Sequence, residues 1–259
     1  MSSERISKLE SLGADVRRPD VNYDAAGDIM MKEAAVNDWT VISDQSFLPS
    51  STWPDGYVEI PSLIVCGYTR LYQEALEQME EPPTHVFVQA GVGGLIGAAI
   101  LQMATESPGT RVVSVEPCNA ACVLSNLSNK ALTGSDLVMF SGSVDSVAAG
   151  LNCGIPSPSL WPVLLAGIDL AVAVGDDRFR EAVKLMYFNS GGRVLAGDSG
   201  AAGLAGFLAL VSGESEEGVR VAREIGLDKG SRVLVINSEG VTDREAFKVS
   251  TGVVDWKAE

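Results

Sequence analysis

The sequence is poor in histidine and in basic residues, and each scarcity excludes a class of function. A Ser–His–Asp triad would have only His85 available, and metal sites rich in histidine are impossible. The 259 residues include 19 lysines and arginines against 34 aspartates and glutamates, which gives a net charge of −15. Such a surface repels phosphate backbones and anionic lipids, so we expect neither nucleic acid nor a membrane as partner.

Cysteines and long apolar runs are also scarce. The four cysteines, Cys66, Cys118, Cys122 and Cys153, form no C-x-x-C pair, which predicts reduced and mostly buried thiols. No uncharged apolar run reaches the roughly 18 residues that a membrane-spanning helix needs. Residues 1–10 are polar and mixed in charge, unlike a secretory signal or a transit peptide. Together these features favour a cytoplasmic protein, and nothing in the sequence indicates a metal site.

Strand-like and helix-like segments alternate along the chain. The predicted strands are residues 14–17, 39–43, 85–89, 111–115, 170–174 and 232–237. The predicted helices are residues 6–12, 24–37, 61–78, 95–104, 120–127, 161–166, 176–188, 199–210 and 216–225. Buried strands separated by helices pair in parallel and carry helices on both faces. The sequence therefore predicts an α/β fold with a mostly parallel twisted sheet.

A loop rich in proline and serine, from residue 45 to residue 56, is the predicted domain boundary. Residues 1–45 are expected to form a partial small α/β domain, and residues 46–259 the large domain. In such sheets ligands bind beyond the carboxyl ends of the strands. The segments predicted to meet there are Asp44, Ala90 to Gly94, Glu116, Asp198 to Gly200, and Ser238 to Gly240.

The strongest local motif is QAGVGGLIG, residues 89–97, between a predicted strand and an apolar helix. Glycines let the backbone approach an anion, and the start of a helix offers free N–H groups, so the motif favours a phosphate cradle. A tight turn that only allows close packing is the other interpretation. A dinucleotide site is disfavoured, because Ile96 stands where the third glycine belongs, although Glu116 imitates the ribose-binding acid.

Other motifs have both a structural and a functional interpretation. Gly197-Asp198-Ser199-Gly200 resembles the nucleophile segment of trypsin-like proteases, but Ala201 replaces a required glycine and the α/β pattern is wrong for that fold. A helix start is the favoured reading of this segment. Ser238 follows a strand and is either a turn residue or a hydrogen-bond partner for a ligand nitrogen. Asp44 is likewise a turn former or a site residue, and His85 is expected to be structural.

In combination, the motifs resemble the fold type II enzymes that use pyridoxal 5′-phosphate, the tryptophan-synthase-β-like superfamily, and most of all the diaminopropionate ammonia-lyases. The pieces occur in family order over nearly the whole chain. They are residues 12–15 (LGAD), 41–44 (VISD), 60–61 (IP), 67–68 (GY), 84–86 (THV), 89–93 (QAGVG), 115–117 (VEP), 149–154 (AGLNCG), 198–201 (DSGA) and 238–243 (SEGVTD).

The resemblance implies a role for each matching residue. The cofactor phosphate would be held by Gly91, Val92, Gly93 and Gly94. Ser238 would face the pyridine nitrogen, and Asp198 stands where relatives often carry glutamate. Asp44 would be the catalytic residue, near the amino groups of an amino-acid substrate. The implied reaction is the α,β-elimination of 2,3-diaminopropionate to pyruvate and ammonia, and relatives are commonly homodimers.

The family lysine that forms a Schiff base with the cofactor has no counterpart in this sequence. The seven lysines are Lys8, Lys32, Lys130, Lys184, Lys229, Lys248 and Lys257, and none follows a strand in the required context. We therefore expect an N-terminal truncation or an incomplete gene model. Two alternatives stay open: a catalytically inactive homologue that acts as a binding or partner protein, and a lyase similar to the serine/threonine dehydratases.

Overall fold

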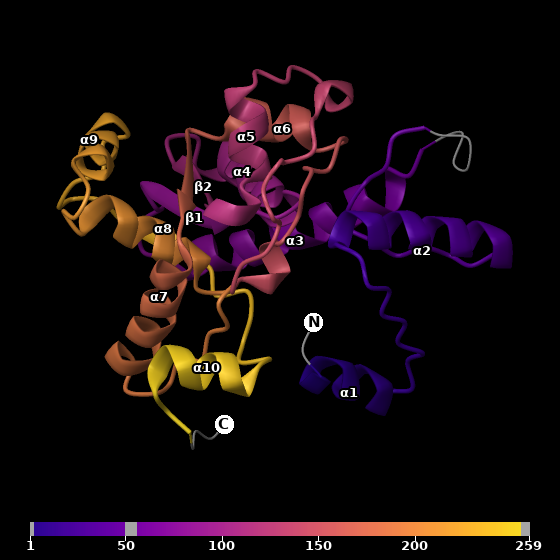
Figure 1. The fold of residues 1–259 in the computed structure, drawn as a ribbon. Coiled ribbons are helices and arrows are strands. Elements are labelled where there is room, and N and C mark those ends of the chain that lie inside the picture. Colours follow the sequence, from indigo (N-terminus) through magenta and orange to yellow (C-terminus); the bar gives the residue numbers. More distant parts are fainter. Residues whose placement is uncertain (1–2, 50–55, 255–259) are drawn as a thin grey trace.

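The computed structural model describes residues 3–49 and 56–254 (Figure 1). The strands are β1 (His85–Gln89), β2 (Arg111–Pro117), β3 (Leu170–Val174) and β4 (Val233–Val235). The α-helices are α1 (Ser3–Ser11), α2 (Tyr23–Asn37), α3 (Glu59–Gln78), α4 (Gly94–Glu106), α5 (Cys122–Ser128), α6 (Trp161–Gly167), α7 (Asp176–Asn189), α8 (Ala202–Val211), α9 (Glu216–Glu224) and α10 (Arg244–Thr251). The 3-10 helices are η1 (Cys118–Ala120), η2 (Gly134–Asp136) and η3 (Ala149–Leu151).

The four strands form one parallel sheet in the order β3-β2-β1-β4. Strand β1 pairs with β2 from His85 opposite Arg111, and with β4 from His85 opposite Val233. Strand β3 pairs with the outer side of β2. The predicted α/β class with a parallel sheet is therefore confirmed.

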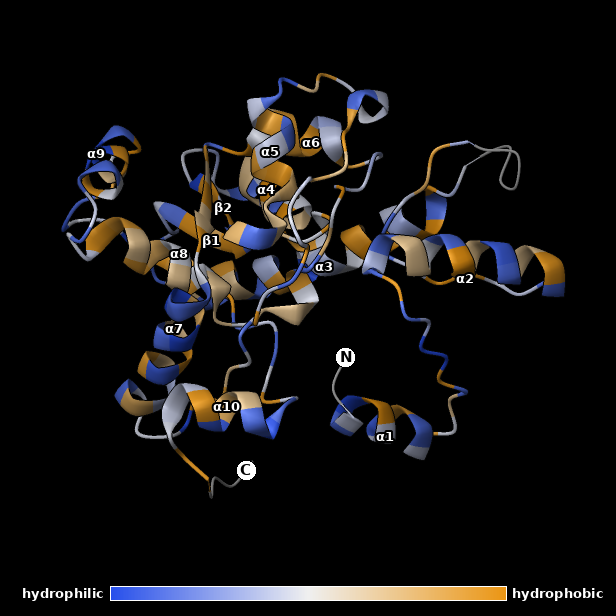
Figure 2. Ribbon diagram, viewed as in Figure 1, coloured by the Kyte–Doolittle hydropathy of each residue, from blue (hydrophilic) through white to orange (hydrophobic). Residues whose placement is uncertain are grey.

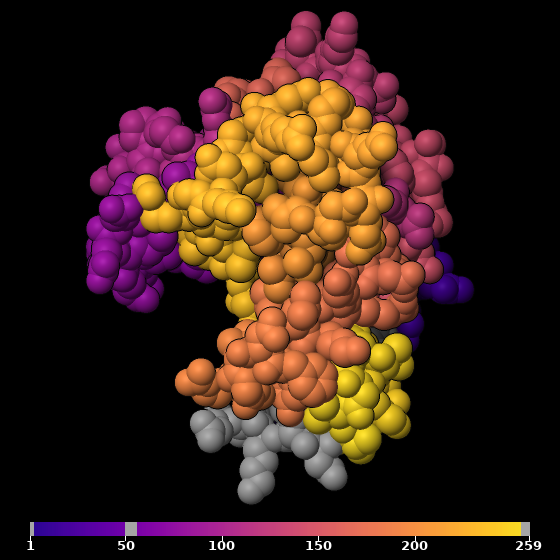
Figure 3. All heavy atoms as spheres, turned by 90° about the vertical axis from the view of Figure 1, so that its left-hand side faces the viewer, coloured from indigo at the N-terminus to yellow at the C-terminus, as the bar shows by residue number. Residues whose placement is uncertain are grey.

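Helices cover both faces of the sheet. Successive side chains of β1 point to opposite faces, and each face packs against its own set of helices. Val86 and Val88 lie in an apolar cluster with residues of α3, α4, α5 and α6. Phe87 lies in a second cluster with residues of α7, α8, α9 and α10. Helix α4 is apolar almost all round, as expected of a helix buried against a sheet (Figure 2). Figure 3 shows the molecule from the side on which α7 and α9 lie.

Close packing of α8 on the sheet depends on glycine. A Cβ atom on Gly203 would lie 2.6 Å from the backbone oxygen of Phe87, and one on Gly206 would lie 2.3 Å from a methyl carbon of Val115. The ring of Phe207 meets Phe87 edge to face, with 5.7 Å between the ring centroids. The small residues of α8 therefore bring the helix backbone directly onto β1 and β2.

The N-terminal segment differs from the prediction in its strands. Residues 14–17 and 39–43 have the expected apolar pattern but form no strand. A strand exists only when a neighbour supplies its hydrogen bonds, and none lies beside these segments in the described ranges. Helix α2 instead packs through Met31 and Ala34 on Val41 and Tyr57. The division into domains at residue 45 stays a prediction.

Candidate functional site

The order of the strands places a crevice at the carboxyl ends of β1 and β4. The chain runs from β1 outward to β2 and β3, and then returns to the other side of β1 to form β4. Ligands bind at such a reversal in open α/β sheets. The side chain of Gln89, the last residue of β1, spans this point: its Nε2 donates to the carbonyl oxygen of Ile236 at 3.0 Å and to Oγ of Ser238.

The glycine turn follows β1 directly and leads into α4. Gly93 is the N-cap of α4 with φ of 103°, a conformation that side-chain-bearing residues rarely adopt. A Cβ atom there would also lie 2.6 Å from Cδ1 of Leu164. At Gly91, a Cβ atom would lie 3.1 Å from Sγ of Cys153. The turn is therefore closely surrounded and admits little besides glycine at these two positions.

The start of α4 presents unpaired backbone donors. The N–H groups of Gly93, Gly94 and Leu95 have no hydrogen-bond acceptor within the described ranges, and Gly93 and Gly94 are buried. Buried donors without a partner are unfavourable. The N-terminus of a helix also carries about half a positive charge. The turn is thus suited to bind an anion through its backbone.

Asp44 lies beside this turn, as the sequence predicts for a residue at the same sheet edge. Its Oδ2 atom is 3.6 Å from the position that a Cβ on Gly94 would take, and the ring of Tyr68 is 3.4 Å from that position. Burial raises the pKa of Tyr68, and the nearby Asp44 carboxylate adds to this shift. Burial likewise raises the pKa of Tyr23, again with a contribution from Asp44. Tyr68 and Asp44 therefore lie beside the start of α4.

Asp198 lies near Glu239, which belongs to the loop that follows Ser238. It is 9% exposed, its Oδ1 atom has no hydrogen-bond partner among the described residues, and it lines a cavity of about 100 Å³ together with Arg5 and Phe247. Burial raises the pKa of Asp198 to about 6, and the neighbouring Glu239 carboxylate contributes. The structure therefore brings Asp198 to the loop after Ser238 and to α10. Its predicted contact with the cofactor stays a prediction.

Two buried thiols flank the glycine turn and were not singled out as site residues. Cys122 Sγ donates to the carbonyl oxygen of Gly91 at 3.5 Å. Cys153 lies against Gly91, and burial raises the pKa of its thiol to about 12, with contributions from Asp24 and Asp44. The sequence feature that could have identified Cys153 as a site residue is the segment of small residues at positions 149–154. Cys122 and Cys153 are buried as predicted, whereas Cys66 and Cys118 are exposed, so the prediction of mostly buried thiols was half right.

The carboxylate of Glu116 is fully engaged in hydrogen bonds to the protein backbone. Its two carboxylate oxygens accept the backbone N–H groups of Val123 and Leu124, each at 2.8 Å, and the side chain is fully buried. Burial raises the pKa of Glu116 to about 8. The residue therefore holds the start of α5 and is not available to bind a ribose, which removes the main support for a dinucleotide site.

His85 and Ser199 have structural partners. Nε2 of His85 hydrogen-bonds the carbonyl oxygen of Ile225 at 3.0 Å, at the amino end of β1 and hence away from the crevice. Ser199 Oγ accepts the N–H of Gly150 at 3.1 Å. The protease-like interpretation of residues 197–200 therefore has no catalytic histidine, and its rejection is consistent with the structure.

The described lysines are on the surface of the molecule. All six that the structure describes are exposed: Lys8, Lys32, Lys130, Lys184, Lys229 and Lys248. Lys257 lies outside the described residues. Within residues 3–49 and 56–254, no cluster of three metal-ligating side chains is found, and no helix is long and apolar enough to span a bilayer.

Comparison with known proteins identifies relatives of this chain. The chain is 32% identical over 254 residues to diaminopropionate ammonia-lyase of Escherichia coli strain K12, over 95% of this chain and 60% of that protein. It is 27% identical over 220 residues to the biosynthetic L-threonine dehydratase of Haemophilus influenzae, over 85% of this chain and 38% of that protein. The chain thus spans about 60% of the length of the ammonia-lyases that it matches.

The fold comparison agrees. A crystal structure of diaminopropionate ammonia lyase from Escherichia coli superimposes with a TM-score of 0.82 and 29% sequence identity, over 96% of this chain and 62% of that chain. A sequence profile described as pyridoxal-phosphate dependent enzyme matches residues 1–224. Because this match covers most of the sequence and includes β1, the glycine turn and β3, the chain belongs to the family of pyridoxal-phosphate dependent enzymes.

Proposed function

We propose that the chain binds pyridoxal 5′-phosphate at the carboxyl edge of its sheet and forms the cofactor-holding part of an ammonia-lyase site for 2,3-diaminopropionate. The observation that carries this proposal is the buried start of α4, where the N–H groups of Gly93, Gly94 and Leu95 are unpaired. A phosphate group would satisfy all of them, with Gly91 and Val92 completing the turn around it. The residues present therefore fit the phosphate end of the cofactor.

Ser238 fits the pyridine end. Its Oγ atom accepts a hydrogen bond from Gln89, so its hydroxyl hydrogen remains available for donation. A neutral donor of this kind suits an unprotonated pyridine nitrogen, whereas a carboxylate at this place would favour the protonated ring. Bound pyridoxal phosphate would supply the electron-accepting ring and the aldehyde that activate the α-carbon of an amino acid. Ser238 would set the orientation and protonation of that ring.

Asp44 is the residue that we propose for the substrate amino groups. Its carboxylate is half-buried beside Gly94 and Tyr68, so its charge is less screened than that of a surface acid. A diamino acid carries a second ammonium group that a hydroxy amino acid lacks. Asp44 would therefore favour 2,3-diaminopropionate over serine or threonine. It would hold the β-ammonium group of the substrate until that group leaves as ammonia.

All six described lysines are exposed, and none of the seven in the sequence follows a strand in the context of the family lysine. The chain alone would therefore bind the cofactor without a covalent bond, and full activity would need an amine supplied from elsewhere. A catalytically inactive binding protein is the alternative. The similarity to a threonine dehydratase supports a second candidate substrate class, the hydroxy amino acids.

The decisive experiment is a titration of the purified chain with pyridoxal 5′-phosphate, followed by absorbance and tryptophan fluorescence, with inorganic phosphate as competitor. We expect saturable binding that phosphate weakens. Ser238→Ala should lower the affinity about 2- to 10-fold, the effect of one hydrogen bond. Ser212→Ala, at an exposed position after α8, is the matched control and should leave the affinity unchanged. No saturable binding would overturn the proposal.

Two further measurements separate the alternatives. Borohydride reduction followed by peptide mapping should label no single lysine, and a stoichiometric label at one lysine would contradict the noncovalent mode. Pyruvate release from 2,3-diaminopropionate, serine and threonine, with and without an added primary amine, tests the substrate class. We expect preference for the diamino acid, and Asp44→Asn should reduce that preference. Cofactor binding without pyruvate release under any condition would support the inactive binding protein.

A further inference from the structure

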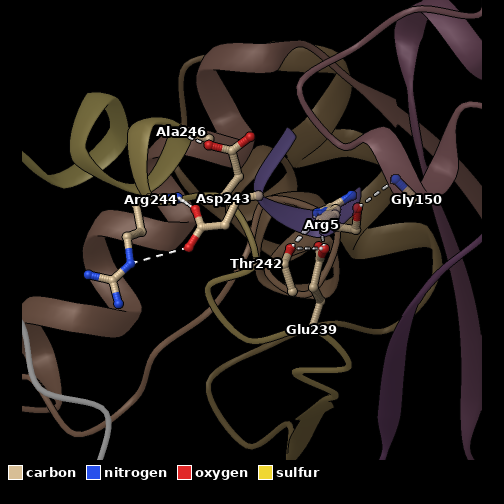
Figure 4. A network of polar contacts seen from close by, with 9 residues as sticks. Arg5, Gly150, Glu239, Thr242, Asp243, Arg244 and Ala246 are labelled. Carbon is tan, nitrogen blue, oxygen red and sulfur yellow. Dashed lines mark hydrogen bonds and ion pairs between the residues drawn. The ribbon is translucent and has the colours of Figure 1, made fainter. Parts of the chain in front are cut away.

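Helix α1 reaches the loop that follows Ser238 through a single arginine. Arg5 pairs with the carboxylate of Glu239, and its Nε donates to Oγ1 of Thr242 at 2.9 Å (Figure 4). Thr242 Oγ1 in turn donates to Glu239 Oε1 at 2.8 Å. The three side chains therefore form a closed network between residues that are more than 230 positions apart in the sequence.

This network is more enclosed than the other ion pairs of the N-terminal segment. The side chains of Arg5 and Glu239 are 26% and 18% exposed, whereas those of Arg17 and Asp15 are 56% and 78% exposed. Helix α1 has no fully buried residue, and its apolar Ile6 is only partly buried, so apolar packing contributes little to its position. Helix α1 also contacts α10, where Glu4 accepts hydrogen bonds from the backbone N–H and from Nε of Arg244, each at 3.3 Å. The place of α1 on the loop thus depends on polar contacts, and mainly on Arg5.

Glu239 is held tightly from the opposite side as well. Its backbone oxygen accepts the N–H of Gly197 at 2.8 Å, and a Cβ atom on Gly200 would lie 2.5 Å from that oxygen. The Glu239 carboxylate also faces the buried Asp198 carboxylate, and the two repel each other. Arg5 supplies the positive charge that keeps the Glu239 side chain in this place.

We propose that Arg5 is a positioning residue for the cofactor ring: it fixes the loop from Ser238 to Thr242 through Glu239, and so aims the Ser238 hydroxyl at the pyridine nitrogen. The inference rests on the proposed function. It gives α1 a role at the cofactor site that is exerted through the loop after Ser238. The loop is clamped between Arg5 on one side and the glycines of residues 197–200 on the other.

The first test compares the pyridoxal 5′-phosphate affinity of the whole chain and of three variants. Arg5→Ala should weaken binding by no more than Ser238→Ala does, within the range of about 2- to 10-fold, because the hydroxyl donor is no longer held in line. Arg5→Lys should recover part of the loss, since lysine keeps the charge but not the two-pronged contact. Glu4→Gln removes the negative charge from the contact between α1 and Arg244 and is the matched control, with a change below about twofold.

The second test is a double-mutant cycle with Ser238→Ala. If Arg5 acts through Ser238, Arg5→Ala should have less than about twofold effect once the hydroxyl is absent. An equal loss in both backgrounds would show that Arg5 acts by another route, and an unchanged affinity in the single variant would also overturn the inference. Absence of cofactor binding by the unaltered chain would instead overturn the proposed function itself.

A third readout needs no cofactor. Amide hydrogen exchange in the ligand-free chain should become faster at residues 238–242 in Arg5→Ala and remain unchanged there in Glu4→Gln. Unfolding midpoints of both variants should stay close to that of the unaltered chain, because neither side chain belongs to an apolar cluster. Unchanged exchange at residues 238–242 in Arg5→Ala would contradict the positioning role.

Discussion

The sheet with its helices and the N-terminal segment, residues 3–49, are held together by different forces. On the sheet, three consecutive residues of β1, Val86 to Val88, are completely buried and join two large apolar clusters. In the N-terminal segment, α1 buries nothing, and α2 buries only Asp24, Met31 and Ala34. The residues proposed for the cofactor stand on the apolar body, whereas Asp44 and Arg5 come from the N-terminal segment, which has only one small apolar cluster in the described ranges. The substrate side of the site is thus the more easily displaced side.

The largest expected effect is in the body. Phe87→Ala removes a completely buried ring that packs on Phe207, and should lower the free energy of unfolding by about 3–5 kcal/mol. Trp39→Ala in the N-terminal segment removes a larger side chain that is 51% exposed, and should change the free energy of unfolding by less than about 1 kcal/mol. Urea unfolding followed by circular dichroism measures both. Similar losses in the two variants would refute the contrast.

The next effect concerns the buried carboxyl of Asp198 and depends on pH. Its pKa is raised from 3.8 to about 6 in the folded chain. Below pH 3.8 the carboxyl is protonated in both the folded and the unfolded state. Between pH 3.8 and about pH 6, Asp198 ionises in the unfolded state but stays mostly protonated in the folded state, so the free energy of unfolding falls as pH rises. Above about pH 6 the contribution of Asp198 to the free energy of unfolding changes no further.

Asp198→Asn should remove this dependence. A shift from 3.8 to about 6 corresponds to roughly 3 kcal/mol, of which about half is lost between pH 5 and pH 7. The variant should therefore gain stability relative to the unaltered chain as the pH is raised across this range, as measured by urea midpoints at several pH values. A difference between the two proteins that is constant with pH would exclude the raised pKa.

Much of the body could be predicted from the sequence, because each of its elements is decided locally or by burial. The run HVFVQ between two turn segments identified β1 with its observed ends, and the apolar period identified α4. The same reasoning failed at residues 14–17 and 39–43, where the pattern is right but no neighbouring strand exists in the described ranges. Helix α10 was not predicted, although Asp243 supplies its N-cap by accepting the N–H of Ala246.

For the site, sequence order placed the residues at one sheet edge but could not assign their partners. Asp44 does lie beside Gly94, and Ser238 does lie beside the end of β1. That Glu116 is taken up by the start of α5 depends on a turn geometry that no spacing rule reveals. That Arg5 reaches Glu239 depends on where α1 docks, which is a contact between the two ends of the chain.

A smaller effect concerns the junction of the two regions. Asp24 of α2 is buried, and its Oδ2 accepts the N–H of Gly154, next to Cys153, at 2.9 Å. Asp24→Ala should lower the free energy of unfolding by about 1–2 kcal/mol, because the buried N–H loses its acceptor. Asp24→Asn keeps an acceptor oxygen and should lose less. Limited proteolysis should also cut residues 3–49 faster in the alanine variant, and equal cleavage would indicate that α2 is fixed by its apolar side chains alone.

The smallest expected effect is on α1. Because its position depends on charged side chains and on no buried one, added salt should loosen it while leaving the sheet unchanged. Amide exchange at residues 3–11 should become faster when the salt concentration is raised, whereas exchange in β1 and β2 should remain the same. Glu4→Gln should reproduce part of this change at low salt, since the contact with Arg244 is worth less than about 1 kcal/mol. Salt-independent exchange in α1 would mean that apolar contacts hold the helix, and the distinction between an apolar body and a polar N-terminal segment would then not extend to α1.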